Sequence, residues 1–399
     1  MTTFTRYLYL KEEVEVALLV SLLNKDKERA LFWAYELYYS GLANELIVTL
    51  WRIYYEFYAM LNPTFETYLK KKEKEIFAAA AEEHAAGHLI GIIIHNLLIR
   101  KFTLDVFMLR EVARKIEMDE DDAKHTFEEL LSHNHYEAVA HKIVTCKCLE
   151  DCEKLAVIAS TYFKTQGIKT PKLLKELHVE GIHPCILLIS RIMHYYAEVQ
   201  VQGQVQGQVH KDKNGSGGGG SCIKMGKNLY LVVDAEEARS YKTMEATEEL
   251  PPNKILQKAV LYSPADHGHN YSVLFIDEYV RAPTILHDYR CDWLYYAVMA
   301  ADNRHKNGGV PIWQERVAKY GGQADDEAKR IVWEDPDGEE LFYSIYGYDP
   351  EEQPIDILTR NIPPLDPSKN ITWRAFYEKY AADLPHLYVP HVDILEALE

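Results

Sequence analysis

Apolar residues recur at helical spacing throughout the stretch from Asn24 to Asn62, NKDKERALFWAYELYYSGLANELIVTLWRIYYEFYAMLN. The pattern holds on both sides of Ser40-Gly41, which predicts two helices joined at that break. Glycine suits the left-handed position that ends a helix, and Pro63 ends the second helix. Aromatic rings fall on nearly every face, so we expect this hairpin in the middle of a layered helical stack. The apolar positions are Ala30, Trp33, Ala34, Leu37, Leu46, Leu50, Ile53, Tyr54, Phe57 and Leu61.

The rest of residues 1–200 shows the same period, with short polar connections. Acidic residues 119–122 open one periodic stretch, where the helix dipole favours negative charge. Helices in series with short loops predict an α-solenoid or an irregular bundle, although no fixed sequence period identifies a repeat family. The expected helices cover residues 12–23, 70–99, 104–115, 123–131, 136–147, 152–163, 170–178 and 184–199.

The pattern changes after residue 222, where short β-rich runs alternate with helical stretches. Residues 331–334 and 339–343 flank Asp335-Pro336-Asp337-Gly338, whose residue types favour a tight turn, so we predict a hairpin there. Thr372 is expected to cap the last helix. The second half is therefore α+β. Its other expected strands are 228–234, 258–262 and 271–276, and its expected helices are 291–301, 311–320 and 372–382.

Residues 201–221 separate the two halves and are low in complexity. A Val-Gln-Gly-Gln unit repeats before residues 215–221, which read GSGGGGS, the composition of an engineered flexible linker. We interpret this linker as the replacement of a long disordered insertion in one natural protein, rather than as a fusion of two proteins. The sequence thus predicts a mostly α fold, with a helical scaffold domain over 1–200, a flexible region over 201–221 and an acidic α+β domain over 222–399.

Composition and charge narrow the class of protein. The chain has 399 residues, 47% of them hydrophobic, which is enough for a sizeable core. No apolar run is long enough to cross a bilayer, and residues 1–10 lack a secretory signal. The net charge of −17 divides into −4 for residues 1–214 and −13 for 222–399. The acidic half should repel nucleic acid at long range. Six cysteines without a disulfide-type spacing indicate a reducing compartment.

Two groups of residues are candidate metal sites. His84, His88 and His95 could share one helix face, but Ala85 stands where a zinc protease of the HExxH type has glutamate. Three cysteines, Cys146, Cys148 and Cys152, follow several histidines, yet the paired CxxC spacing of zinc modules is absent. Buried thiols and surface histidines are the default interpretation of both. The histidines before the cysteines are His133, His135 and His141. We find no phosphate-binding loop and no nucleophile elbow, so we expect no catalytic, cofactor or metal residue.

Tyrosine is unusually frequent, with 28 residues, many of them in adjacent pairs. A pair directs one ring into the core and the other outward, and exposed tyrosine suits both protein interfaces and base stacking. Codon bias in an A+T-rich genome would explain the same excess. Our candidate partner-binding residues are Tyr39, Tyr55, Leu61, Tyr196 and Tyr296. A basic run, Lys70, Lys71, Lys72 and Lys74, is the candidate nucleic-acid contact, although such runs are usually solvated helix faces.

Several aromatic motifs resemble a group of uncharacterised proteins of giant, nucleocytoplasmic large DNA viruses. They are FWAYELYYSG (32–41), WRIYYEFY (51–58), LVVDAEE (231–237), PIWQERV (311–317), FYSIYGYDPEEQ (342–353) and TWRAFYEKY (372–380). They occur in both halves, which favours one natural protein. The resemblance implies a host-cytoplasmic location, in the viral factory, and allows similarity to the scaffold subunit of a cap-binding translation-initiation complex. It transfers no catalytic residue.

A scaffold of that type usually holds the cap-binding subunit through a Tyr-x-x-x-x-Leu-apolar helix. The nearest stretch here runs from Tyr55 to Leu61, with Met60 in place of the leucine. We therefore hypothesise a non-enzymatic helical scaffold that binds protein partners in a viral gene-expression complex, with translation initiation as the process that we would examine first. The alternatives are a nucleic-acid-binding accessory factor and an enzyme or metalloprotein with an unrecognised site.

Overall fold

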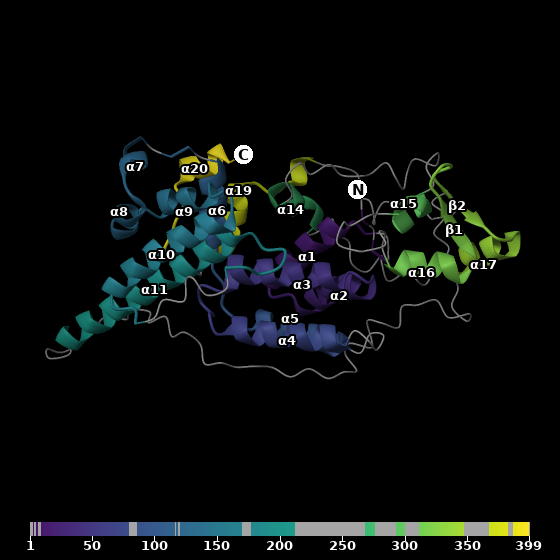
Figure 1. The fold of residues 1–399 in the computed structure, drawn as a ribbon, viewed down its shortest axis with the longest axis horizontal. Helices are drawn as coiled ribbons and strands as arrows, with labels where there is room; N and C mark the ends of the chain where they lie inside the picture. Colours follow the sequence, from purple (N-terminus) through teal and green to yellow (C-terminus); the bar gives the residue numbers. More distant parts are fainter. Residues whose placement is uncertain are drawn as a thin grey trace. The chain divides into compact units, whose positions relative to one another are not determined.

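The computed structural model is mostly helical in the part of the chain that it describes, with one two-stranded sheet in the C-terminal part (Figure 1). The mostly α fold class with a smaller α+β part is therefore confirmed. The described residues are 3, 5–6, 9–79, 86–115, 117–118, 120–169, 177–211, 268–275, 293–299, 311–346, 367–381 and 386–398.

The chain divides into two compact units that are interleaved along the sequence. Unit 1 comprises Met1–Ile47, Lys72–Ile99 and Leu231–Ile371, and unit 2 comprises Val48–Lys71, Arg100–Tyr230 and Thr372–Glu399. Each unit thus combines segments from both sides of residues 201–221. This division differs from the consecutive domains, 1–200 and 222–399, expected from the sequence.

Unit 1 is built around α1 (Lys11–Leu23), which packs against α2 (Lys27–Tyr39) and α14 (Gly268–Phe275). Helix α2 also packs against α5 (Gly87–Leu98), which contacts α1 as well. Unit 1 also contains α15 (Trp293–Met299), α16 (Pro311–Lys319), β1 (Gly322–Asp325), β2 (Arg330–Trp333), α17 (Pro336–Tyr346) and the short helix η4 (Pro367–Lys369). The strands are antiparallel, with Gly322 opposite Trp333 and Asp325 opposite Arg330.

Unit 2 has α6 (Asp105–Lys115) at its centre, in contact with α9 (Tyr136–Val144), α11 (Pro184–Lys211) and the π-helix η1 (Tyr54–Tyr58). A solenoid repeat contacts only its neighbours along the chain. Helix α6 instead contacts elements from before and well after it, so the helices of unit 2 form an irregular bundle. The remaining helices are α7 (Glu120–Lys124), α8 (Phe127–Ser132), α10 (Leu149–Thr165), α19 (Trp373–Ala381) and α20 (Val392–Ala397). Helices α3 (Ala43–Ile53) and α4 (Phe65–Ala79) contribute residues to both units.

The aromatic stretch 24–62 is core, as its pattern predicts. All residues from Ala30 to Tyr39 on α2 and all five residues of η1 are buried. Gly41 has a φ of 79°, which confirms the left-handed break between the two helices. The second helix changes to π geometry at its end, where the N–H of Ala59 donates to the carbonyl of Tyr54 at 2.7 Å.

The predicted hairpin around Asp335-Pro336-Asp337-Gly338 is wrong, because this stretch begins helix α17. The Asp335 carboxylate accepts the N–H of Gly338 at 2.8 Å, and Pro336 occupies the first helical position, where its missing N–H costs nothing. Strand β2 pairs instead with the upstream β1. In the true turn, Asp325 accepts the N–H groups of Glu327 and Ala328, both at 2.9 Å.

Other predictions changed in type or extent. Residues 271–275, expected to be a strand, lie in α14, and residues 201–211, expected to be flexible, continue α11. The acidic helix divides into α7 and α8, because Thr126 and Glu129 form a capping box that begins a new helix. Strands 228–234 and 258–262, most of helix 170–178 and the GSGGGGS run lie outside the described residues. No helix within the described ranges is long and apolar enough to span a membrane.

Candidate functional site

The structure places the candidate partner-binding residues inside the fold. Tyr39 is 4% exposed, Tyr55 1%, Leu61 8% and Tyr196 4%. The Tyr55 ring stacks on Trp51 at 5.6 Å, and the Tyr196 hydroxyl donates to the Leu131 carbonyl at 2.8 Å. These four side chains therefore belong to the core instead of forming a surface. The side chain of the fifth, Tyr296, lies outside the part of the chain that is described.

The four candidate lysines lie on helix α4 and differ in exposure. Lys71 and Lys74 are exposed, whereas Lys70 and Lys72 are half-buried. The Lys70 ammonium lies 3.3 Å from Glu66, and the Lys72 ammonium lies 2.6 Å from Glu75. Because these carboxylates are on the same helix, they offset much of the positive charge that a phosphate backbone would need. The structure brings the four lysines together on one helix without making a strongly basic face.

The candidate metal ligands do not form a site among the residues that are described. There, no three His, Cys, Asp or Glu side chains are grouped to hold a metal ion. His84 is outside the described residues, and His95 bonds the Gly91 carbonyl at 2.7 Å through Nδ1. His135 Nδ1 lies 2.6 Å from Asp122, and His141 Nδ1 lies 3.0 Å from the Ala113 carbonyl. His88 and His133 complete the set, and His133 is an exposed residue beside His135.

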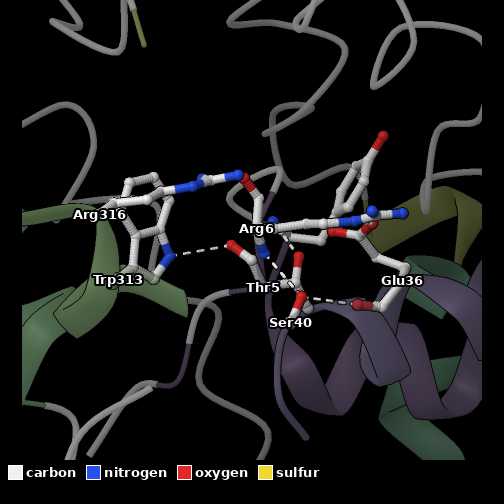
Figure 2. Close-up of polar contacts among 7 residues, drawn as sticks. Thr5, Arg6, Glu36, Ser40, Trp313 and Arg316 are labelled. Carbon is white, nitrogen blue, oxygen red and sulfur yellow. Dashed lines mark hydrogen bonds and ion pairs between the residues drawn. The ribbon is translucent and has the colours of Figure 1, made fainter. Parts of the chain in front are cut away.

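A buried polar cluster in unit 1 holds the N-terminal segment, and we call it the N-terminal cluster (Figure 2). The Arg6 guanidinium donates from Nε to Glu36 Oε2 at 2.9 Å, and their side chains are 5% and 0% exposed. The backbone N–H of Arg6 donates to Ser40 Oγ at 2.8 Å. Glu36 lies in the last turn of α2 and Ser40 is its C-cap, so one helix end supplies both acceptors.

Helix α16 binds the same N-terminal segment from another direction (Figure 2). Trp313 Nε1 donates to the Thr5 carbonyl at 3.1 Å, and Arg316 Nη1 donates to the Arg6 carbonyl at 3.0 Å. Because these residues are three positions apart, they lie on one face of α16. Trp313 is fully buried and Arg316 is 5% exposed. The segment is therefore attached to α2 and α16 through both side-chain and main-chain groups.

The N-terminal cluster also affects a neighbouring tyrosine. The Arg6 guanidinium carbon lies 5.0 Å from the ring centre of Tyr39, a cation–π contact. Burial and the neighbouring Tyr38 raise the pKa of Tyr39 to about 12, although Arg6 opposes this rise. Tyr39 is therefore neutral at physiological pH and serves as a packing surface for Arg6.

A second buried cluster lies in unit 2, between η1 and α6. Arg110 Nη2 lies 2.5 Å from Glu56 and 2.7 Å from Glu111, and the Arg52 guanidinium approaches Glu56 at 3.3 Å. Glu56 is 2% exposed and Arg110 is 5% exposed. A buried charge needs a partner of opposite sign. Arg110 meets this need for one carboxylate from η1 and one from α6, and so joins the two elements.

A third cluster fixes the C-terminal segment of unit 2, and we call it the C-terminal cluster. The fully buried Asp105 carboxylate lies 3.0 Å from His386 Nδ1 and accepts the backbone N–H of Leu387 at 2.7 Å. His386 Nε2 lies 2.7 Å from the Ala381 carbonyl. Both ring nitrogens thus face groups that can only accept, so the ring must donate from both and be an imidazolium. The bond to Asp105 accordingly raises the pKa of His386.

One local pattern in the sequence points to two of these clusters. Glu36 and Glu56 are single acidic residues within aromatic runs, FWAYELYY and IYYEFY, where a helix with apolar rings on every face must bury them. That signal identifies the buried carboxylates but not Arg6 or Arg110, which come from distant segments. Asp105 and His386 are 281 positions apart and carry no comparable signal.

The thiols are arranged differently from the predicted cysteine group. Cys148 is exposed at the start of α10, with Sγ 3.4 Å from Asp151. Cys152 is buried, and its Sγ lies 3.7 Å from that of Cys185 on α11, a residue that the sequence did not indicate. Half-buried Cys146 donates from Sγ to the Lys142 carbonyl at 3.5 Å. Burial raises the pKa of Cys146 and Cys152 to about 12 and that of Cys185 to about 11, so these thiols are protonated at neutral pH.

Comparisons of this chain with protein-family models, with curated proteins and with solved structures found no match.

Proposed function

We propose that this chain is a non-enzymatic helical scaffold that binds protein partners. The observation that carries the proposal is that buried charged residues join distant segments of the chain. The N-terminal cluster, the Glu56–Arg110–Glu111 cluster and the C-terminal cluster each join segments that are distant in sequence within one unit. Such ion pairs fix chain ends and helices in one arrangement, as a surface that must stay preformed requires.

The exposed side chains are consistent with this role. Large apolar residues are exposed on both units, including Phe77 and Leu341 in unit 1 and Val157 and Val389 in unit 2. Single exposed apolar residues are ordinary, but they also supply the contact area of protein interfaces. The acidic net charge of −17 favours protein partners over nucleic acid.

The resemblance to giant-virus proteins supports a proposal about where the scaffold acts and in which process. We propose that the scaffold acts in a viral gene-expression complex in the host cytoplasm, in the viral factory. Translation initiation is the process that we propose to examine first, since the mostly helical architecture suits the scaffold subunit of a cap-binding complex. Viral or host translation factors are the partners that follow from this proposal.

Affinity purification of the tagged full-length protein from infected cells tests the proposal. We expect a defined set of translation or transcription factors to co-purify, unchanged by nuclease treatment. The matched variant Lys71→Glu with Lys74→Glu reverses the two exposed charges of α4. It should retain the same partners, because a protein-binding scaffold does not depend on that basic run.

Two results would reject the proposal. Loss of all partners after nuclease treatment, together with loss in the lysine variant, would assign α4 to nucleic-acid binding. Steep salt dependence of RNA binding by the purified protein would support that alternative. Failure to recover any partner at low salt would also reject the scaffold role.

A further inference from the structure

Three thiols of unit 2 form a continuous series from the half-exposed surface to the core. Cys146 and Cys152 are near enough for each to affect the pKa of the other, and Cys152 Sγ lies 3.7 Å from Cys185 Sγ. The Cys185 thiol donates to the Ile143 carbonyl at 2.9 Å. Its single hydrogen is thereby used, so Cys152 is the donor between the two sulfurs. Cys185 is consequently oriented with a sulfur lone pair facing Cys152.

We propose that Cys152 and Cys185 are the site of a reversible disulfide that joins α10 to α11. A disulfide bond is about 2.0 Å long, so the sulfurs must approach by about 1.7 Å, a distance that side-chain rotation can supply. Cys152 is fully buried and Cys185 is 3% exposed, which places the bond inside the helical packing.

Cys146 provides the route by which an oxidant reaches the buried pair. The oxidant class is a small disulfide such as glutathione disulfide. The Cys146 thiolate attacks it, forms a mixed disulfide and releases one glutathione thiolate. The Cys152 thiolate then attacks the Cys146 sulfur, forms a Cys146–Cys152 bond and releases the second glutathione.

A final exchange moves the bond inward. The Cys185 thiolate attacks the Cys152 sulfur, the Cys152–Cys185 bond forms, and Cys146 leaves as a thiolate that takes up a proton. Overall, two protein thiols lose two electrons and two protons, and one glutathione disulfide becomes two glutathione thiols. Each exchange joins two sulfurs that are already neighbours in the structure.

The chemistry of the thiols determines the rate. Thiolates are the attacking species, and the raised pKa values leave little thiolate at neutral pH. Oxidation should therefore be slow at pH 7 and accelerate as the pH rises. The disulfide should therefore form during prolonged exposure to the oxidant and not during a brief exposure.

Peptide mapping by mass spectrometry tests the proposal in the full-length protein. After incubation with glutathione disulfide at pH 8, we expect a linked peptide pair containing Cys152 and Cys185, which disappears on reduction. The cysteines are 33 positions apart, so the bond should raise the melting temperature by roughly 5–15 °C. Bonding of Cys146 to Cys148 or persistent glutathione on Cys146, without the internal pair, would overturn the proposal.

Single variants distinguish the role of Cys146 as the entry point of the oxidant from formation of the Cys152–Cys185 disulfide. Cys146→Ser should slow formation of the Cys152–Cys185 pair without preventing it, whereas Cys148→Ser, at an exposed position, should leave the rate unchanged. Cys185→Ser should abolish the rise in melting temperature under oxidation. A rise of equal size in Cys185→Ser would show that another pair is responsible.

Discussion

Replacing Asp105 by asparagine removes one negative charge from the interior of unit 2 and leaves the side-chain shape unchanged. The carboxylate is fully buried and bonds to both His386 Nδ1 and the Leu387 N–H, at 3.0 and 2.7 Å. Asparagine can still accept from one donor, but its NH2 group then faces the other. The substitution therefore leaves a buried imidazolium without a counter-ion.

The cost follows from the burial of the pair. Removing one partner of a buried ion pair costs about 3–5 kcal/mol. His386 is 13% exposed and can release its proton, which limits the cost to the lower end, about 3 kcal/mol. For domains of 150–250 residues, 1 kcal/mol changes the melting temperature by about 2–4 °C. We therefore expect Asp105→Asn to lower it by roughly 6–12 °C.

Thermal unfolding followed by circular dichroism at pH 6.5 provides the measurement. The chain supplies a matched control, because His391 and Asp393 form the same type of pair at 3.3 Å with side chains 74% and 85% exposed. Exposed pairs contribute little, so Asp393→Asn should leave the melting temperature nearly unchanged. Equal effects of the two substitutions would refute the assignment of Asp105 as a buried counter-ion.

Three further predictions concern the two charged clusters and the aromatic core. The raised pKa of His386 means that the folded state binds the proton of this residue more tightly than the unfolded state does. The resulting stabilisation is complete below about pH 6.5 and is lost as the pH rises through the folded pKa. The difference in melting temperature between the wild type and His386→Gln should therefore be larger at pH 6 than at pH 9. Glu36→Gln should lower the free energy of unfolding by about 3–5 kcal/mol in urea titrations. The double variant Arg6→Met with Glu36→Leu should lower it by less, because no buried charge is left unpaired. A double variant that is less stable than the single variant would contradict this prediction. Tyr55→Ala with Leu61→Ala should lose more than about 5 kcal/mol, and an unchanged melting temperature would return these residues to the list of surface candidates.

Periodic patterns in the sequence predict the helical architecture well, because a helix that buries one face has an apolar residue at every third or fourth position. The hairpin from Asn24 to Asn62 and the cap at Thr372, whose Oγ1 accepts the Ala375 N–H at 3.1 Å, follow from such local rules. Asp335-Pro336 was misread because the same residues begin turns and helices, and only the position of the partner strand distinguishes the two.

The candidate sites were harder to predict, for two physical reasons. Adjacent tyrosines suggest one buried and one exposed ring, yet Tyr54 and Tyr55 are both buried, because both α6 and α11 pack against η1. The polar clusters join residues far apart in the chain, as Arg6 and Arg316 show, and no local pattern encodes such a contact. Cys185 was missed for the same reason.

The π geometry of η1 has a consequence for changes in chain length. A π turn is equivalent to one extra residue inserted into an α-helix. Deletion of a single residue there would allow the helix to return to the α form while the flanking turns keep their orientation. The same deletion within α2 would rotate every following side chain by about 100°. Residues 54–58 are therefore the place in this buried helix where deletion of one residue can be absorbed, and a laboratory variant of shorter length should begin there.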